Sequence, residues 1–148
     1  TVASAAYSAS IEALHPGALV VEQACPAFVP LIEAGDCSSD ELRQLAKAYL
    51  DPLLAASVET IVLGCTHYPL LIPLLKQLLP DAIQLVDPAI GVARQLDAVL
   101  GVPAAATGGT LELRQCRFCV TADPDGFAER ATPWLGARPE VHLQRLQS

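Results

Sequence analysis

The hydrophobic and polar positions along this chain alternate between two periods. Short, mostly apolar runs, which are typical of buried strands, occur at residues 18–21, 60–63 and 83–86. Between and after them, apolar residues recur every three or four positions, which is the spacing of an amphipathic helix. Strands that alternate with helices form parallel sheets, because each helix carries the chain back before the next strand begins. The pattern therefore predicts an α/β fold built on a parallel sheet.

The expected helices begin and end at recognisable residues. The first begins after Ser4, a candidate cap, and ends near His-Pro-Gly at residues 15–17. Another begins at Ser-Ser-Asp-Glu, residues 38–41, and Pro52 is expected to kink or restart it. Further helices are expected over residues 68–79, 88–100 and 124–135. The side chains expected to face inward are Ile90, Ala93, Leu96 and Val99 in the helix over residues 88–100, and Phe127, Ala131 and Trp134 in the last helix.

The pattern changes after Gly101. Residues 102–109 are rich in Ala, Pro and Gly and are expected to form a loop. A strand is expected over residues 116–121, and after the last helix residues 140–146 alternate with period two, as in a half-buried strand.

Composition excludes several classes of function. The 148 residues fit one ordinary domain, or one small domain with part of another, and 52% of them are apolar, which is enough for a buried core. The net charge of -7 comes without any basic cluster, so nucleic acid is not an expected partner. No apolar run approaches the roughly 20 residues that span a bilayer. The chain is expected to be a soluble, cytoplasmic protein that does not bind membranes.

The five cysteines are odd in number and irregularly spaced, so they are expected to be thiols in a reducing compartment rather than a disulfide framework. Cys25 and Cys37 have no His or basic residue nearby, and Cys116 and Cys119 form a single Cys-x-x-Cys pair, too few ligands for zinc. No metal or other cofactor is expected. Because the chain begins at Thr1 and contains no Met, a missing upstream segment is expected.

The most informative stretch is residues 61–71, Ile-Val-Leu-Gly-Cys-Thr-His-Tyr-Pro-Leu-Leu. An apolar strand ends before Cys65, and parallel sheets bind ligands at the carboxyl ends of their strands. A helix opening near Pro69 would direct backbone N–H groups at the same place, and its partial positive charge would favour a thiolate. His67 can hold or supply a proton. Cys65 is therefore a candidate base or nucleophile, although a small buried thiol at a strand end would give the same pattern.

The string from Gly64 to Leu71, Gly-Cys-Thr-His-Tyr-Pro-Leu-Leu, resembles the second catalytic-cysteine motif of glutamate racemases and is long enough to be specific. Three weaker matches agree with that family in order and spacing. They are residues 1–7 (Thr-Val-Ala-Ser-Ala-Ala-Tyr), residues 24–33 (Ala-Cys-Pro through Glu33) and residues 120–127 (Val-Thr-Ala-Asp through Phe127). The resemblance covers nearly the whole chain.

The resemblance implies a two-base racemase that interconverts L- and D-glutamate and supplies D-glutamate for bacterial peptidoglycan. One thiolate removes the α-proton and a thiol on the opposite face returns one, because a single base would tend to return the proton to the face it left. Without pyridoxal phosphate or metal, placed donors must stabilise a carbanion-like transition state. In the family this site lies between two similar α/β domains that each supply one cysteine.

The resemblance also implies roles for individual residues. Cys65 matches the second catalytic cysteine, which serves the L-glutamate face. His67 matches the histidine that assists it, and Glu33 matches an acidic residue that works with this histidine. Thr66 matches a threonine that binds the substrate, and Thr1 matches one near it. The residues alone allow plainer interpretations: a helix cap for Thr66 and an ordinary surface glutamate for Glu33.

The discontinuous first domain of the family gives the expected division of the chain. Residues 1–86 correspond to the second domain, and residues 87–148 to a segment that returns to the first. The Asp-Ser-Gly, Pro-Tyr-Gly and Ala-Cys-Asn-Thr segments of the family, the last with the other cysteine, are absent from this sequence. By itself the chain is therefore expected not to racemise glutamate. A homodimer is left open as its assembly.

Two alternatives stay open at the level of sequence. One is another racemase or decarboxylase of the same superfamily that acts through the same cysteine, although the run from His67 to Pro69 favours glutamate. The other is a non-catalytic α/β module that binds a carboxylate beside Cys65 without turnover. An Ala-Cys-Asn-Thr type of motif upstream would favour the racemase.

Overall fold

The computed structural model describes residues 2–101 and 113–146. Thr1, a predicted substrate-binding residue, and the predicted loop at residues 102–109 lie outside the described residues. The chain divides into two compact units, Thr1–Ala98 and Val99–Ser148.

The boundary between the units lies near the carboxyl end of helix α5 (Pro88–Leu100), whereas the predicted domain boundary precedes this helix. The assignment of residues 1–86 and 87–148 to two domains stays a prediction.

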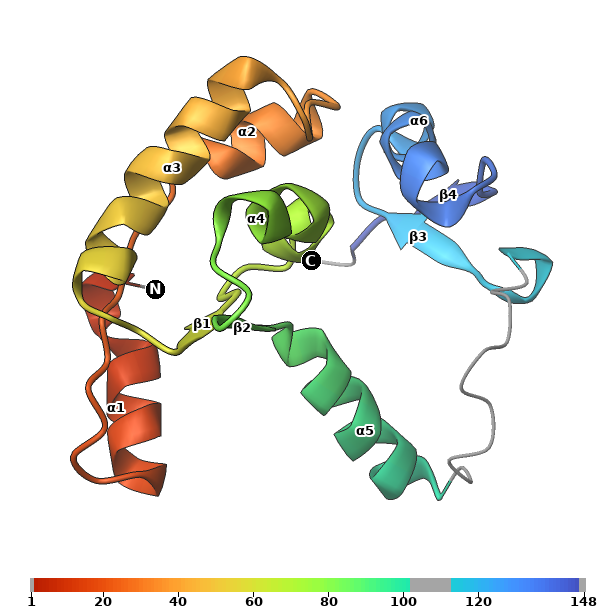
Figure 1. Cartoon of the computed structure of the whole chain (residues 1–148). Coiled ribbons are helices and arrows are strands. Elements are labelled where there is room, and N and C mark those ends of the chain that lie inside the picture. The colour runs from red at the N-terminus through yellow and green to blue at the C-terminus, as the bar shows by residue number, and fades with distance from the viewer. Residues whose placement is uncertain (1, 102–112, 147–148) are drawn as a thin grey trace. The chain divides into compact units, whose positions relative to one another are not determined.

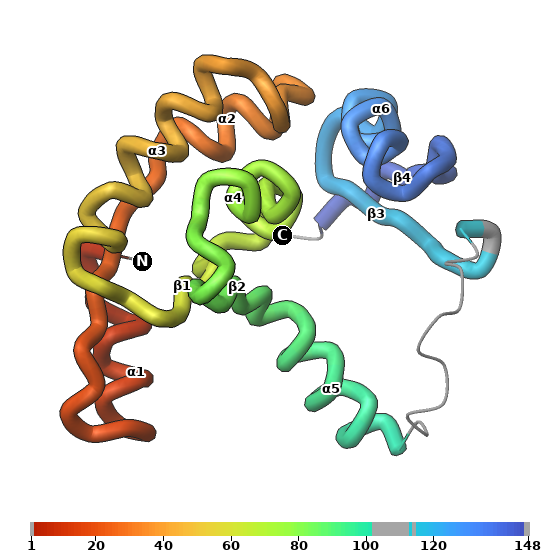
Figure 2. Tube along the Cα trace, in the orientation of Figure 1, coloured from red at the N-terminus to blue at the C-terminus, as the bar shows by residue number. Residues whose placement is uncertain are grey.

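The first unit contains a pair of parallel strands and a set of helices (Figure 1). Its elements in chain order are η1 (Val2–Ser4), α1 (Ala6–Leu14), α2 (Phe28–Glu33), α3 (Asp40–Ala55), β1 (Thr60–Val62), η2 (Tyr68–Leu71), α4 (Ile72–Leu78), β2 (Gln84–Val86) and α5. Thr60 pairs with Gln84 and Ile61 with Leu85 in parallel register. As the trace in Figure 2 shows, η2 and α4 carry the chain from the end of β1 back to the start of β2. The predicted α/β fold with parallel pairing is confirmed.

One hydrophobic core joins α2, α3, η2 and α4 to β1. Leu42 of α3 and Leu71 of η2 are fully buried, and Ile61 of β1 is 9% exposed. The other buried members are Phe28, Ile32, Ala46, Leu50, Leu63, Leu74, Leu75 and Leu79. Burial of one such large side chain stabilises the fold by roughly 1.5–3 kcal/mol. The core therefore holds α2, which carries Glu33, and η2, which follows Cys65, in one packed body.

Helix α3 begins as predicted. The Ser39 hydroxyl accepts a hydrogen bond from the Leu42 backbone N–H at 3.1 Å, a cap that contributes about 1 kcal/mol. Asp36 in turn accepts hydrogen bonds from the hydroxyl and the backbone N–H of Ser39, and these bonds lower the pKa of Asp36. Of the two outcomes expected at Pro52, a kink or a restart, the restart does not occur, because the helix continues past this residue. Pro52 lies in the last turn, where its missing N–H costs a single hydrogen bond.

The single helix predicted over residues 68–79 is wrong, because η2 and α4 replace it and meet at Ile72. Pro73 has no N–H and cannot donate to the carbonyl of Pro69, four residues earlier. The Ile72 N–H bonds to that carbonyl instead, which tightens the first turn into a 3₁₀ helix. The helix end expected beside Cys65 is therefore only a four-residue 3₁₀ helix, which lacks the summed dipole of a full α-helix.

Two predictions near the N-terminus are also wrong. Residues 18–21 form no strand, and in the described part of the chain they pair with neither β1 nor β2. An apolar run predicts burial, but a strand also needs a neighbour for its backbone hydrogen bonds. Ser4 does not cap α1, because it belongs to η1, and Ala5, in a left-handed conformation with φ 48°, occupies the cap position without a side-chain hydrogen bond.

Helix α5 spans the predicted residues, but its predicted inward face is not buried. Ile90, Leu96 and Val99 are 55%, 54% and 82% exposed, and Ala93 is exposed as well. A helical period identifies the apolar side of a helix, and whether another element covers that side depends on the tertiary structure.

The second unit contains η3 (Leu113–Gln115), β3 (Phe118–Val120), α6 (Pro124–Leu135) and β4 (Val141–Leu143), with β3 and β4 parallel. The bounds of α6 are those predicted. Ala128 is its buried residue, at 3% exposure, and Phe127 and Ala131 are half-buried. The Phe127 ring lies 6.3 Å from that of Phe118 in β3. Trp134 is 45% exposed, so the side of α6 on which it lies is not fully covered by the described residues; the helix turns its small Ala128, not the indole, toward its neighbours.

Candidate active site

Cys65 lies just beyond the carboxyl end of β1. The Leu63 N–H donates to the Val86 carbonyl at 2.9 Å, which extends the parallel pairing past the last residue of the strand. Cys65 follows, is partly exposed, and lines a pocket of about 1380 Å³ within the first unit. In open parallel sheets this edge is where ligands bind. The strand therefore presents the thiol to a space that a small molecule can enter.

Gly64 leaves room for the close approach of Tyr7. The ring of Tyr7, from α1, lies so close to Gly64 that a Cβ at this position would be 3.0 Å from the nearest ring carbon. Tyr7 thus covers the backbone immediately before Cys65, and glycine leaves room for it. Sequence reasoning placed Tyr7 on a helix face and missed this contact, although Tyr7 and Cys65 both lie in segments that match the same family.

Three predicted site residues, Glu33, His67 and Cys65, form a row. Nε2 of His67 lies 2.6 Å from Oε1 of Glu33, and Nδ1 of the same ring lies 4.0 Å from Sγ of Cys65. Because an ionised carboxylate only accepts hydrogen bonds, we assign the imidazole proton to Nε2, which directs the lone pair of Nδ1 toward the sulfur. In this tautomer the imidazole can take the thiol proton and later return it.

The order of these groups is that of a carboxylate that orients a base, which serves a thiol. The side chains of His67 and Glu33 are 31% and 48% exposed. An ion pair at such a surface contributes only about 0–1 kcal/mol to stability. Its value lies in the orientation of the imidazole, because the second ring nitrogen must point at Cys65 for proton transfer.

Thr66 is exposed and lines the pocket next to Cys65. It is not a helix cap, because His67 occupies the N-cap position of η2 and makes no side-chain cap hydrogen bond. Two amides of this turn are used within it: Tyr68 N–H donates to the Cys65 carbonyl at 3.2 Å, and Leu70 N–H to that of His67 at 3.0 Å. These two amides are therefore not directed at a ligand beside Cys65.

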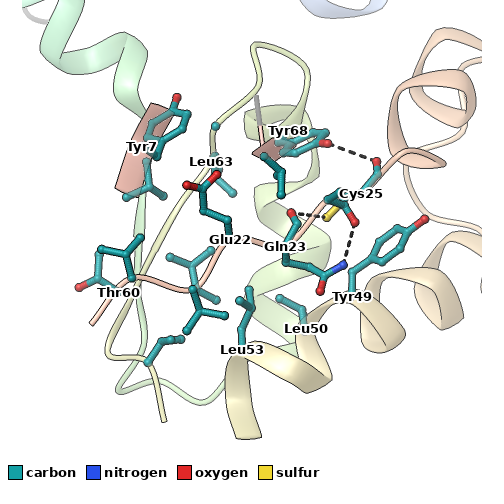
Figure 3. Close-up of a pocket in the computed structure, with 18 of the residues that line it drawn as sticks. Tyr7, Glu22, Gln23, Cys25, Tyr49, Leu50, Leu53, Thr60, Leu63 and Tyr68 are labelled. Carbon is teal, nitrogen blue, oxygen red and sulfur yellow. Dashed lines mark hydrogen bonds between the residues drawn. The ribbon is translucent and has the colours of Figure 1, made fainter. Parts of the chain in front are cut away.

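The pocket beside Cys65 is lined largely by apolar side chains, among them Leu50 and Leu53 of α3 (Figure 3). Glu22 places a carboxylate in this wall. It accepts hydrogen bonds from the hydroxyl of Ser8 at 2.5 Å and from the Ser8 N–H at 3.0 Å, and these bonds, the hydroxyl first, lower the pKa of Glu22. Glu22 is thus ionised at neutral pH, and an anionic ligand is disfavoured next to it.

A second thiol, Cys25, lines the same pocket (Figure 3). Burial raises the pKa of Cys25 to about 11, and the charge of Cys65 adds to this effect. Sγ of Cys25 lies 3.7 Å from the carbonyl oxygen of Gln23, to which the S–H can donate. At neutral pH the Cys25 thiol is protonated and therefore unsuited to act as a base.

We expect Cys25 to react slowly with alkylating reagents. The pKa of about 11 leaves less thiolate at pH 8 than an ordinary thiol has, so iodoacetamide should react about a hundredfold more slowly than with an unperturbed cysteine. The matched control is the same thiol in denaturant, followed by mass spectrometry of the peptide that contains it. Equal rates in the folded and the denatured chain would contradict the raised pKa.

Three further cysteines remain, Cys37, Cys116 and Cys119. Burial, and then the charge of Asp36, raise the pKa of Cys37. Cys116 and Cys119 belong to the second unit, where Cys119 is exposed. Within residues 2–101 and 113–146, no group of three or more His, Cys, Asp or Glu side chains is placed to hold a metal ion. No helix in this part of the chain is long and apolar enough to cross a membrane.

Comparison with known proteins gives a consistent result. No protein-family model matches the chain. "Glutamate racemase" of Synechococcus sp. (strain CC9605) is 73% identical over 148 residues, and that of Gloeobacter violaceus (strain ATCC 29082 / PCC 7421) is 45% identical over 147 residues. Each alignment covers 99% of this chain, with 56% of the first relative and 54% of the second. The crystal structure of glutamate racemase from Francisella tularensis in complex with D-glutamate matches with a TM-score of 0.80 and 28% identity, over 99% of this chain and 54% of that one.

The chain belongs to the glutamate racemase family. It spans about half the length of the relatives that it matches. The resemblance based on the residues around Cys65 is thereby confirmed, and it extends over the whole chain. The α/β fold observed here is that of a part of a glutamate racemase.

Proposed function

We propose that this chain carries one of the two proton-transfer sites of a cofactor-independent glutamate racemase, with Cys65 as its thiol. The observation that supports the proposal best is the row in which Glu33 contacts His67 and His67 faces Cys65. Because the chain spans about half the length of its relatives, the proposed activity is that of a polypeptide that also contains the second site.

The proposed reaction begins with transfer of the Cys65 thiol proton to Nδ1 of His67. The resulting thiolate removes the α-proton of L-glutamate, and the electrons of the broken C–H bond stay on the α-carbon. A thiol of the second site then protonates the opposite face and gives D-glutamate. Counted from the thiolate, one thiol is formed and one is consumed, while the first proton stays on His67. The reverse reaction uses the same groups with their roles exchanged, and the Cys65 thiolate that it leaves takes this proton back.

Substrate binding is assigned to the residues beside the thiol. Thr66 is exposed next to Cys65, and we propose that its hydroxyl donates to a carboxylate of glutamate and helps to stabilise charge that develops on it. Thr1 is proposed to bind the substrate as well, on the family resemblance alone. The ionised Glu22 disfavours the substrate carboxylates in its part of the pocket.

Glutamate as the small-molecule substrate is supported by the Francisella tularensis racemase, whose crystal structure contains D-glutamate. We propose that the D-glutamate made by the complete enzyme is used in the cytoplasm for peptidoglycan.

Protection of Cys65 by substrate tests this proposal. In the racemase that contains this chain, D- or L-glutamate at ten times its Kd is expected to slow alkylation of Cys65 by iodoacetamide about tenfold, because bound substrate covers the thiol. Cys119, exposed in the second unit, is the control thiol and is expected to react at an unchanged rate.

Two outcomes of this experiment would overturn the assignment. One is a Cys65 alkylation rate that does not depend on glutamate while the enzyme turns over. The other is equal protection of Cys119, which would indicate a general change in the protein instead of occupation of the site.

A further inference from the structure

We infer that Tyr68 is a positioning residue: its ring and hydroxyl hold α2 against the turn after Cys65, so that Glu33 stays in contact with His67. This inference rests on the proposed function, because it concerns how the proposed base is oriented. It adds a residue to which no role was given by the sequence.

The contact between Glu33 and His67 cannot hold itself in place. Both side chains are partly exposed, at 48% and 31%, and an exposed ion pair is weak because water competes for both partners. The two residues are also 34 positions apart in the chain. Something else must therefore set the distance between α2 and the turn that carries His67.

A row of three aromatic rings supplies this link. Phe28, the first residue of α2, is only 4% exposed. Its ring meets that of Tyr68 edge-on, with centroids 5.4 Å apart and planes at 89°, and meets that of Tyr49 in α3 at 5.1 Å and 82°. Aromatic rings favour such perpendicular contacts. Phe28 is thus fixed between two tyrosines, one of which is the residue directly after His67.

Two hydroxyl groups anchor the chain that leads into α2. The Tyr68 hydroxyl donates to the backbone carbonyl of Cys25 at 3.2 Å (Figure 3), and the Tyr49 hydroxyl accepts from the Ala27 N–H at 3.3 Å. Both bonds end on the residues just before Phe28. Helix α2 therefore enters at a fixed place relative to Tyr68.

The Tyr68 hydroxyl remains a donor over the working pH range. Burial raises the pKa of Tyr68 to about 12, and the charges of Cys25 and Cys65 add to the effect. Because the raised pKa keeps the phenol protonated, the bond to the Cys25 carbonyl persists while Cys65 changes its protonation state.

The geometry makes the site sensitive to this anchor. Helix α2 has six residues and spans about 9 Å, with Phe28 at one end and Glu33 at the other. A small tilt at the Phe28 end moves the carboxylate at the far end. Since Nε2 and Oε1 are 2.6 Å apart, a shift of about 1 Å is enough to break the bond that orients the imidazole.

The test is Tyr68→Phe in the complete racemase, which keeps the ring contact with Phe28 and removes the hydroxyl. We expect kcat to fall about tenfold and KM to change less than about twofold, because base orientation and not substrate binding is affected. In a Glu33→Gln background the same substitution is expected to lower kcat less than about threefold, because the contact that Tyr68 positions is already lost.

Leu79→Val, in the core at the carboxyl end of α4, is the control for a general loss of stability. It is expected to shift the unfolding midpoint about as much as Tyr68→Phe does and to leave kcat unchanged. An equal loss of kcat in both the wild-type and the Glu33→Gln backgrounds would overturn the positioning role. A loss of kcat in Leu79→Val as large as that in Tyr68→Phe would also overturn it. Neither result would touch the proposed function, which fails only if Cys65 is dispensable or glutamate does not protect it.

Discussion

Cys65→Ser is expected to lower kcat/KM of the complete racemase about a thousandfold or more in both directions. A serine hydroxyl gives up its proton far less readily than a thiol, and inversion needs an acid or base on each face of the α-carbon. Circular-dichroism progress curves started from L-glutamate and from D-glutamate measure both directions.

Exchange of the α-proton with heavy water adds a second measurement to this prediction. The site that remains in Cys65→Ser can still exchange the proton of one enantiomer without inverting it, and the family resemblance implies that this enantiomer is D-glutamate. Cys116→Ser and Cys119→Ser are the matched controls, and both are expected to keep near-normal turnover. Normal racemisation by the Cys65 variant would rule out its assigned role.

Leu71→Ala is expected to destabilise the first unit by about 3 kcal/mol, within the range of 2–5 kcal/mol for such truncations. Leu71 is fully buried where η2 meets α4, so the lost methyl groups leave a cavity that the tight turn cannot close. Urea unfolding followed by circular dichroism measures the change. Because η2 follows directly on Cys65 and His67, we also expect a loss of activity before global unfolding.

The control for this substitution is Leu14→Ala, at the end of α1, where the side chain is 77% exposed. It is expected to change the free energy of unfolding by less than about 0.5 kcal/mol. Equal effects of the two substitutions would mean that the core around Leu71 is not packed as described.

The ends of some helices follow from local chemistry, and for that reason they were predictable. Ser39 can cap α3 with its own hydroxyl, and α6 begins at the predicted Pro124, with the Asp123 side chain accepting from the Gly126 N–H. From β1 onward, the order of strands and helices follows in the same way from periodicity. The break between η2 and α4 was also available from the sequence, because Pro73 lies four residues after Pro69 and cannot donate the helical hydrogen bond.

The burial of helix faces and the pairing of strands could not be predicted from local sequence. Residues 18–21 are as apolar as a buried strand, and yet they pair with no strand in the described part of the chain. A strand needs a neighbouring strand for its backbone hydrogen bonds, and the local sequence does not show whether such a neighbour is present. The apolar stripe of α5 likewise predicts a face without predicting its cover, and Val99 is 82% exposed. These failures share one physical cause, which is that local propensity does not specify non-local contacts.

The candidate site, too, was predictable from local sequence only in part. By itself the sequence determined the chemistry: a thiol at a strand end, an imidazole two residues later, and the family in which this order occurs. Only the tertiary structure decided that Glu33, 34 positions from His67, lies 2.6 Å from its ring. That distance depends on Phe28 packing between Tyr49 and Tyr68, because weak, exposed charges do not bring distant segments together, whereas the burial of large apolar side chains does.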